Sequence, residues 1–131
     1  MKLTEKEREY IQAVRNRITP ATWTQDCIAR DKDKAEVAYD DLAAVCWCLE
    51  GHVRCVVPSA DQDAIHYLLD QHGRGHKDLT ATGDMIWDED GDPVHVGDVF
   101  TVWFDGYIDF NDHWSTDVTD VIQLLDDLLA A

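Results

Sequence analysis

The residues with the clearest potential for metal chemistry form a thiol–imidazole–thiol series in the middle of the chain. Cys48, His52 and Cys55 are spaced i, i+4, i+7, so on a helix they share one stripe. Structural zinc sites use paired C-x₂-C spacings, and three ligands from one straight helix close a tetrahedron poorly. Cysteine is also common on buried apolar helix faces. We therefore expect core packing and no metal here. The alternative is a metal- or ligand-binding domain centred on these residues, in one version a small enzyme.

Other patterns for catalysis or cofactor binding fit poorly. A calcium loop with Gly91 at position 6 would place Ile86 at position 1 and Gly97 at position 12, where carboxylates are needed. A loop beginning at Asp31 has Ala35 at position 5. A cysteine nucleophile needs nearby cations to lower its pKa, and an acidic chain acts against that. No G-x-G-x-x-G, P-loop or G-x-S-x-G motif occurs. We expect a non-enzymatic protein without a cofactor.

The strongest chemical feature of the sequence is its charge. The 131 residues include 11 basic and 27 acidic side chains, a net charge of −16. Lys77 is the last basic residue, and Asp78 to Ala131 carries 14 acids over 54 residues. This charge excludes direct binding of nucleic acid through a basic patch, and it disfavours anionic membrane surfaces. Two interpretations stay open: the charge recognises a partner, or it serves only solubility or adaptation to high salt.

Some of the acids stand where helix electrostatics prefers the opposite sign. Asp126 and Asp127 fall in the last turns of the C-terminal helix, where the dipole favours cations. Duplex DNA carries one negative charge per ~1.7 Å of axis, so a face covered with carboxylates can imitate it. We therefore predict a basic, nucleic-acid-binding protein as the partner. The predicted partner-binding residues are Asp88, Glu89, Asp90, Asp92, Asp105, Asp109, Asp112, Asp117, Asp120 and Asp127.

Four helices and a small sheet are expected to position these residues. Thr4 and Glu7 have the spacing of a capping box, and apolar residues recur at helical spacing in all four segments. The expected helices cover about 5–18, the segment from Asp40 or Asp41 to the residue before Pro58, the segment from Ser59 or Asp61 to Gly73, and a final segment capped by Ser115, Thr116 or Asp117.

The region before the last helix has a different pattern. Arg74 to Gly83 is predicted to be a polar loop, whereas Met85 to Phe110 contains β-rich runs separated by acidic turns. Asp105-Gly106 is expected to be a hairpin turn before a strand at Tyr107-Ile108. The predicted fold is α+β, a single domain over 1–131 with four helices. A small antiparallel β-meander, an acidic insertion at about 84–110, precedes the C-terminal helix.

The cysteine content and hydropathy bear on the compartment. The four cysteines follow no recognisable signal peptide, so reduced thiols in a cytoplasm are expected, in a bacterial cell or a phage-infected host. No apolar run approaches the ~20 residues of a membrane-spanning helix.

Several short motifs occur in a recognisable order. They are Trp23-Thr24, Ala29-Arg30-Asp31, the A-x-x-W-C-x-x-G run ending at Gly51, Phe110-Asn111-Asp112, and Leu124-Leu125-Asp126. By this order the chain resembles a family of small uncharacterised bacterial and phage proteins, a domain of unknown function. The resemblance implies a compact, helix-rich domain often carried by mobile genomes, and it implies no activity. The acidic stretch from Asp78 to Gly106 looks like an insertion relative to that pattern, and Asn111-Asp112 is expected to be a structural cap and turn.

Together these patterns favour an acidic interaction protein that binds a basic surface of a partner protein. In its most specific form it is a nucleic-acid mimic that inhibits a host nucleic-acid-binding defence complex. The alternatives are the metal- or ligand-binding domain described above and an accessory domain whose charge is merely solubilising.

Overall fold

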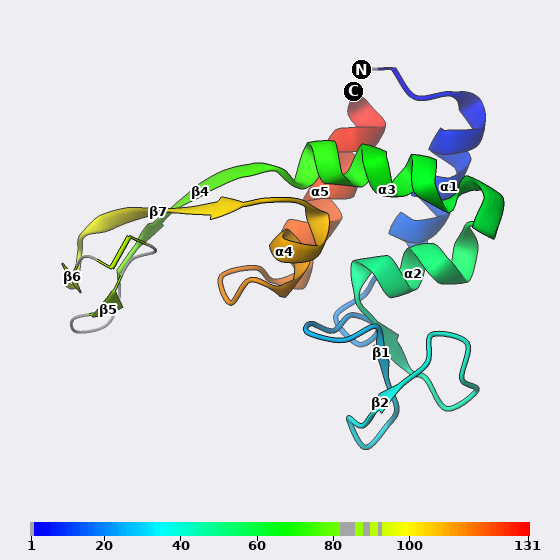
Figure 1. Ribbon diagram of the computed structural model, residues 1–131, viewed down its shortest axis with the longest axis horizontal. Coiled ribbons are helices and arrows are strands. Elements are labelled where there is room, and N and C mark those ends of the chain that lie inside the picture. Colours follow the sequence, from blue (N-terminus) through cyan, green and yellow to red (C-terminus); the bar gives the residue numbers. More distant parts are fainter. Residues whose placement is uncertain (1, 82–85, 88–89, 92) are drawn as a thin grey trace.

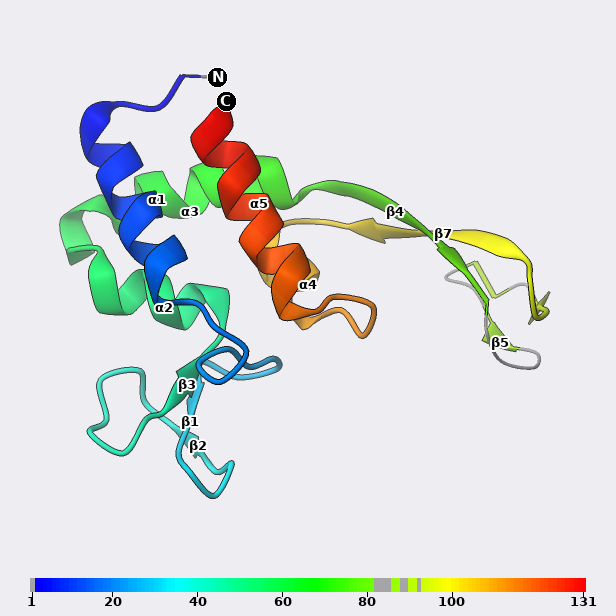
Figure 2. The same cartoon turned by 180° about the vertical axis from the view of Figure 1, so that it is seen from behind.

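A body of five helices carries two extensions that leave it in different directions (Figure 1). A computed structural model describes residues 2–81, 86–87, 90–91 and 93–131. One extension, residues 18–48, is called the junction segment below. The other, residues 75–104, is called the β arm and projects far from the helices in both views (Figures 1 and 2). The two chain termini lie close together on the helical body (Figure 2).

The helices begin where the sequence provides caps. They are α1 (Glu5–Arg17), α2 (Leu49–Val56), α3 (Ser59–Gly73), α4 (Tyr107–Asp112) and α5 (Val118–Ala130). Thr4 and Glu7 form the predicted capping box of α1, and Asp117 forms a second one with Asp120 at the start of α5. None of the helices in the described residues is long and apolar enough to cross a membrane.

The apolar stripes of the helices meet in one core. Most of its fully buried members come from α1, α2, α3 and α5, which explains the helical spacing of apolar residues in those segments, and α4 adds Tyr107. Residues at the centre of this core are Ile11, Val14, Leu49, Val53, Ile65, Leu69, Val121, Leu125 and Leu128. No cation lies in the last turn of α5, but α1 supplies two. Arg8 donates to the carbonyl of Leu129, and Arg15 Nε lies 2.8 Å from Asp126 Oδ1. The charge of Asp126 therefore has a partner within the fold.

The junction segment contains a small antiparallel sheet. Its central strand β1 (Ala29–Arg30) pairs with β2 (Glu36–Val37) on one side and with β3 (Cys46–Trp47) on the other. The prediction that a helix begins at Asp40 or Asp41 is therefore wrong, because α2 begins only at Leu49. The Asp41 carboxylate instead accepts a hydrogen bond from the Ala43 amide in a short turn. The apolar spacing of Leu42 and Val45 does not mark a buried helix face, because both side chains are exposed.

The β arm is built from two long strands and a short hairpin. Strands β4 (Gly75–Thr80) and β7 (Val99–Phe104) pair antiparallel along their whole length, and β5 (Ile86–Trp87) pairs with β6 (Pro93–Val94). The predicted polar loop at Arg74–Gly83 is thus largely a strand. Its alternate residues face solvent, so its composition is polar although its backbone is extended. The predicted meander is also corrected, because the first long strand pairs with the last strand of the arm.

Residues after the arm form a helix in place of the expected strand. Asp105-Gly106 is no hairpin turn; Asp109 Oδ2 accepts from the Asp105 amide at 3.0 Å, and α4 follows. Tyr107 is buried against α3, where Gly73 lies so close that an added Cβ would be 2.6 Å from the Tyr107 Cα. The α+β class is confirmed, with α4 as a short fifth helix that the sequence pattern did not reveal.

Candidate interaction surface

His52, the central residue of the thiol–imidazole series, is completely buried. Arg17 Nε donates to His52 Nδ1 at 3.3 Å, so Nε2 carries the proton and donates to the Thr22 carbonyl at 2.8 Å. Burial lowers the pKa of His52 to about 4. The imidazole is therefore neutral, and both of its nitrogens are used in the protein's own hydrogen bonds.

The two cysteines of the series also have structural contacts. Cys48 is the N-cap of α2, and its Sγ accepts from the Gly51 amide at 3.3 Å. Burial raises the pKa of Cys48 to about 11 and raises that of Cys55, whose thiol lies 3.7 Å from the Tyr39 carbonyl. Within the part of the chain that the structure describes, no three His, Cys, Asp or Glu side chains are grouped to hold a metal ion. Cys48, His52 and Cys55 thus serve the protein's own hydrogen bonds and packing, and the described residues offer the metal-centred alternative no ligand set.

Asn111 connects the junction segment to the helical body. Its side chain is almost completely buried, and its Oδ1 accepts from Trp23 Nε1 at 2.7 Å and from the Leu49 amide at 3.1 Å. Its Nδ2 donates to the Thr24 carbonyl at 3.3 Å and to Asp112 Oδ1 at 2.8 Å. The W-T and F-N-D motifs therefore meet in space, and Asn111 is a buried connector rather than the expected cap and turn.

The loop after Asn111 is fixed by the same segment. Gln25 Nε2 reaches the carbonyls of Asn111, His113 and Thr116 at 2.8, 2.9 and 3.2 Å. Asp112 Oδ1 accepts from the Asp26 amide at 2.9 Å. These contacts hold the chain between α4 and α5, which begins after the predicted partner-binding residue Asp112 and ends at another, Asp117.

The W-C-x-x-G motif has a steric role at the same junction. A Cβ on Gly51 would lie 2.4 Å from the Ile28 carbonyl oxygen, so only glycine lets α2 approach this backbone. The Trp47 indole donates to the Tyr39 carbonyl at 2.9 Å, and the Arg17 guanidinium lies 4.9 Å from the ring centroid. The W-T, W-C-x-x-G and F-N-D motifs of the sequence therefore attach the junction segment to the helices.

The β arm has one apolar face and one face open to solvent. On the inner face, the Phe104 ring lies 5.2 Å from Phe110 and 5.1 Å from His113, centroid to centroid. On the outer face, the His76 and Trp103 rings are 4.8 Å apart. Val99 and Trp103 are 68% and 61% exposed, which makes this face unusually apolar for an exposed surface.

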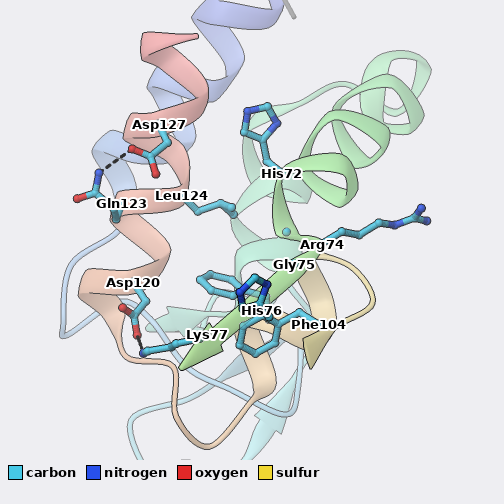
Figure 3. A pocket seen from close by; sticks show the side chains of 12 residues that line it. His72, Arg74, Gly75, His76, Lys77, Phe104, Asp120, Gln123, Leu124 and Asp127 are labelled. Atoms are coloured by element: carbon cyan, nitrogen blue, oxygen red, sulfur yellow. Dashed lines mark hydrogen bonds and ion pairs between the residues drawn. The ribbon is translucent and has the colours of Figure 1, made fainter. Parts of the chain in front are cut away.

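Lys77 attaches the base of the arm to α5. Its Nζ donates to the Ser115 carbonyl at 3.1 Å and to Asp120 Oδ2 at 3.0 Å. Between the two elements lies a shallow groove of about 350 Å³ (Figure 3). His76 and Lys77 line one wall, and Asp120 and Asp127 extend from α5 on the other. The groove is therefore lined by imidazole, ammonium and carboxylate groups, which are suited to recognition of polar groups.

Several predicted partner-binding acids have roles within the fold. Asp112 belongs to the Asn111 network, Asp117 and Asp120 cap α5, and Asp109 accepts from the Asp105 amide. Asp127 accepts from Gln123 at 2.8 Å and remains exposed.

The other predicted acids are distributed along the arm. Asp90 lies between β5 and β6 and is exposed, and Asp105 follows β7 and is exposed as well. Asp88, Glu89 and Asp92 lie outside the described residues. The structure brings Asp120 and Asp127 together in the groove and Asp105 and Asp109 together at the end of β7. The sequence analysis did not identify His72, Arg74 and His76 as residues that line the groove. For His76 and Lys77, the available signal was the alternation of exposed and partly buried positions along β4.

The comparisons with known proteins identify one family. A family described as "Family of unknown function (DUF6197)" matches residues 3–131, a range that includes the β arm. No curated protein and no solved structure matches the chain. The match over almost the whole length shows that the chain belongs to this family of unknown function.

Proposed function

We propose that the protein is a non-enzymatic interaction protein that binds a basic surface of a partner protein with its β arm and the adjoining ends of α4 and α5. The observation that carries this proposal is the charge and exposure of the arm. Residues 75–104 contain seven acids and one basic side chain other than histidine, Lys77, which is already paired with Asp120. The arm projects from the body and exposes Val99 and Trp103 on its outer face.

These two properties serve recognition in different ways. Complementary charge speeds encounter and rejects partners of the wrong sign, with an effect that weakens as salt screens it. Large apolar side chains contribute contact area that salt does not weaken, and tryptophan is enriched at the centres of protein interfaces. A projecting acidic arm with an exposed tryptophan combines both.

The most specific form of the proposal is that the partner is itself a nucleic-acid-binding protein. Its support is the run of 14 acids from Asp78 to Ala131 without a lysine or arginine. A carboxylate-covered surface of this kind competes with phosphates for a basic groove. Inhibition of a defence complex in a phage-infected bacterium is the version that fits a domain often carried by mobile genomes, although the resemblance itself implies no activity.

A capture experiment tests the proposal. The intact protein is used as bait in nuclease-treated lysate of its source cell, and bound proteins are eluted with stepped salt and then with competitor duplex DNA or RNA. We expect one nucleic-acid-binding protein or complex that the competitor releases. Many basic proteins that elute together at low salt, indifferent to competitor, would show that the charge is only solubilising.

Two variants of equal net charge make the experiment specific to this surface. The first replaces four predicted acids by amides: Asp90→Asn, Asp105→Asn, Asp109→Asn and Asp127→Asn. The matched control neutralises four exposed acids elsewhere: Glu9→Gln, Asp33→Asn, Asp40→Asn and Asp63→Asn. The first variant should bind the captured partner more weakly and with a shallower salt dependence, whereas the control should not. Equal losses in both variants would mean that net charge, not this surface, governs binding.

A further inference from the structure

We infer that the edge of β7 that faces away from β4 takes up an extended basic segment of the partner as an added antiparallel strand. This inference rests on the proposed function and specifies the partner segment by its chemistry and its backbone conformation. It is carried by three properties of the arm: the direction of the β7 backbone groups, the side chains along this edge, and the surrounding charge.

The register shows which β7 groups point away from β4. The Ala81 amide donates to the Asp98 carbonyl at 2.8 Å, in the same register as the pairs from Gly75↔Phe104 to Thr80↔Val99. Ladder hydrogen bonds alternate along an antiparallel pair. Phe100 and Val102 therefore bond to β4, and Val99 and Thr101 direct their N–H and C=O groups to the opposite side.

Contacts between side chains agree with this assignment. Residues of the non-hydrogen-bonded pairs lie closer together than those of hydrogen-bonded pairs. Thr101 Oγ1 donates to Asp78 Oδ1 at 2.7 Å across one such pair, and the His76 and Trp103 rings are 4.8 Å apart across the next. Among the described residues, β4 is the only strand that pairs with β7.

The side chains leave the β7 edge unprotected. Natural edge strands commonly carry charged residues, proline or a bulge that block further pairing. Val99–Phe104 reads V-F-T-V-W-F, six residues without charge, proline or glycine, whereas β4 on the other edge has Lys77 and Asp78. A two-stranded ribbon is also marginal by itself, and a third strand would strengthen it. The β7 edge is thus the side of the arm suited to pairing.

Charge selects the occupant of this edge. Residues 75–104 contain seven acids and one lysine, and Asp98 stands directly before β7 and Asp105 directly after it. A second copy of the chain would bring another net charge of −16 and the same acidic arm to the contact, and the two copies would repel each other. Strand addition supplies affinity through main-chain hydrogen bonds, and alternate side chains supply specificity. An extended segment with lysines or arginines at alternate positions meets both requirements.

A pair of peptides tests the inference with the intact protein. The probe is a ten-residue peptide in which lysine alternates with valine and threonine. Its control has the same sequence with N-methyl groups on alternate backbone nitrogens, which preserves the charge and removes one row of donors. We expect the control to bind about tenfold more weakly, as two or so lost hydrogen bonds imply. We also expect the probe, not the control, to slow amide hydrogen exchange at Val99 and Thr101.

A proline variant tests the same edge from the side of the protein. Thr101→Pro removes an outward N–H without removing a β4–β7 ladder bond, and proline is accepted on strand edges that face solvent. Ala60→Pro, in the first turn of α3 where no helix bond is lost, is the matched control. We expect Thr101→Pro to bind the probe about tenfold more weakly and Ala60→Pro to bind it as the wild type does.

The outcomes separate strand addition from recognition by charge. Equal binding of both peptides, no protection at Val99 and Thr101, and no effect of Thr101→Pro would overturn strand addition. The proposed function would then stand or fall by the capture experiment and its amide variants alone. Formation of a dimer in sedimentation equilibrium that Thr101→Pro abolishes would also overturn the inference, because the occupant would be a second copy of the chain.

Discussion

The two extensions of this protein are held in opposite ways. The junction segment is attached by buried, directional hydrogen bonds that converge on Asn111. It is also attached through Gly51, where a larger residue would collide with the Ile28 backbone. The β arm is attached by an apolar strip and by Lys77 at its base, and the side chains of Val99 and Trp103 on its outer face are exposed. The W-T, W-C-x-x-G and F-N-D motifs form the attachment of the first region, while the second region has the more negative net charge and exposes Trp103.

This difference separates residues that specify the fold from residues available for recognition. A buried polar network fixes one arrangement because each unsatisfied member costs free energy. An exposed strand edge specifies little by itself, and its unused backbone groups are available to another chain. Changes in the junction should therefore lower global stability, whereas changes in the arm should act locally and on binding.

The largest expected effect comes from the centre of the junction. Asn111→Ala leaves two donors, Trp23 Nε1 and the Leu49 amide, without their acceptor in a buried site. We expect the free energy of unfolding to fall by about 4 kcal/mol, measured by urea denaturation. Ile108→Ala, half-exposed on the same helix, should change it by less than about 1 kcal/mol. Equal effects of the two substitutions would contradict the role assigned to Asn111.

Two glycines compare the regions directly. In Gly51→Ala the new Cβ collides with the Ile28 carbonyl oxygen, a backbone atom that cannot move aside freely. We therefore expect the free energy of unfolding to fall by about 3 kcal/mol. Gly91 in the arm has φ +84° with nothing within 4 Å of an added Cβ, so Gly91→Ala should cost only about 1 kcal/mol. Thermal denaturation of both variants measures the difference. A smaller loss for Gly51→Ala than for Gly91→Ala would break the comparison.

The sequence predicted what local rules determine, and it missed what distant contacts determine. The capping box at Thr4 and the apolar stripe of α5 are local, and both are confirmed. The start of α2 depends on β3 pairing with β1, so apolar spacing around Leu42 misled the prediction. The paired residues of β4 and β7 lie between 19 (Thr80 and Val99) and 29 (Gly75 and Phe104) positions apart, and spacing along the chain does not reveal such pairing.

The candidate surface was predictable only as a composition. The acids of the C-terminal region were evident, but their division between roles in the fold and exposure was not. Asp117 and Asp120 sit three residues apart before an apolar run, a spacing that already indicates a cap. The expected cap and turn at Asn111-Asp112 did not reveal the contacts of Asp112 with Asp26 and Asn111, because these depend on the packing of the junction segment against α4.

The buried imidazole gives the junction a pH dependence. Burial lowers the pKa of His52 to about 4, below the ordinary value of 6.5, so between these values the unfolded chain binds a proton that the folded chain does not. The contribution of neutral His52 to the free energy of unfolding is therefore complete above pH 6.5. It is lost as the pH falls toward 4, which lowers that free energy by up to about 3 kcal/mol. In urea denaturation between pH 7 and pH 4, the free energy of unfolding should fall less steeply with decreasing pH for His52→Gln than for the wild type. Parallel declines would contradict this assignment.

The smallest effect on global stability is expected at the base of the arm. Lys77→Met removes the contacts with Ser115 and Asp120 but preserves a long side chain, and such a half-exposed ion pair contributes about 1 kcal/mol or less. Lys32→Met, on an exposed turn of the junction segment, removes the same single positive charge and is the control for Lys77→Met. We expect Lys77→Met to speed amide hydrogen exchange along β4 and β7 while the core helices keep their protection. If exchange in the core helices rose equally, the arm and the body would unfold together. The arm would then belong to the same cooperative unit as the junction, and the contrast between the two regions would lie in their surfaces alone.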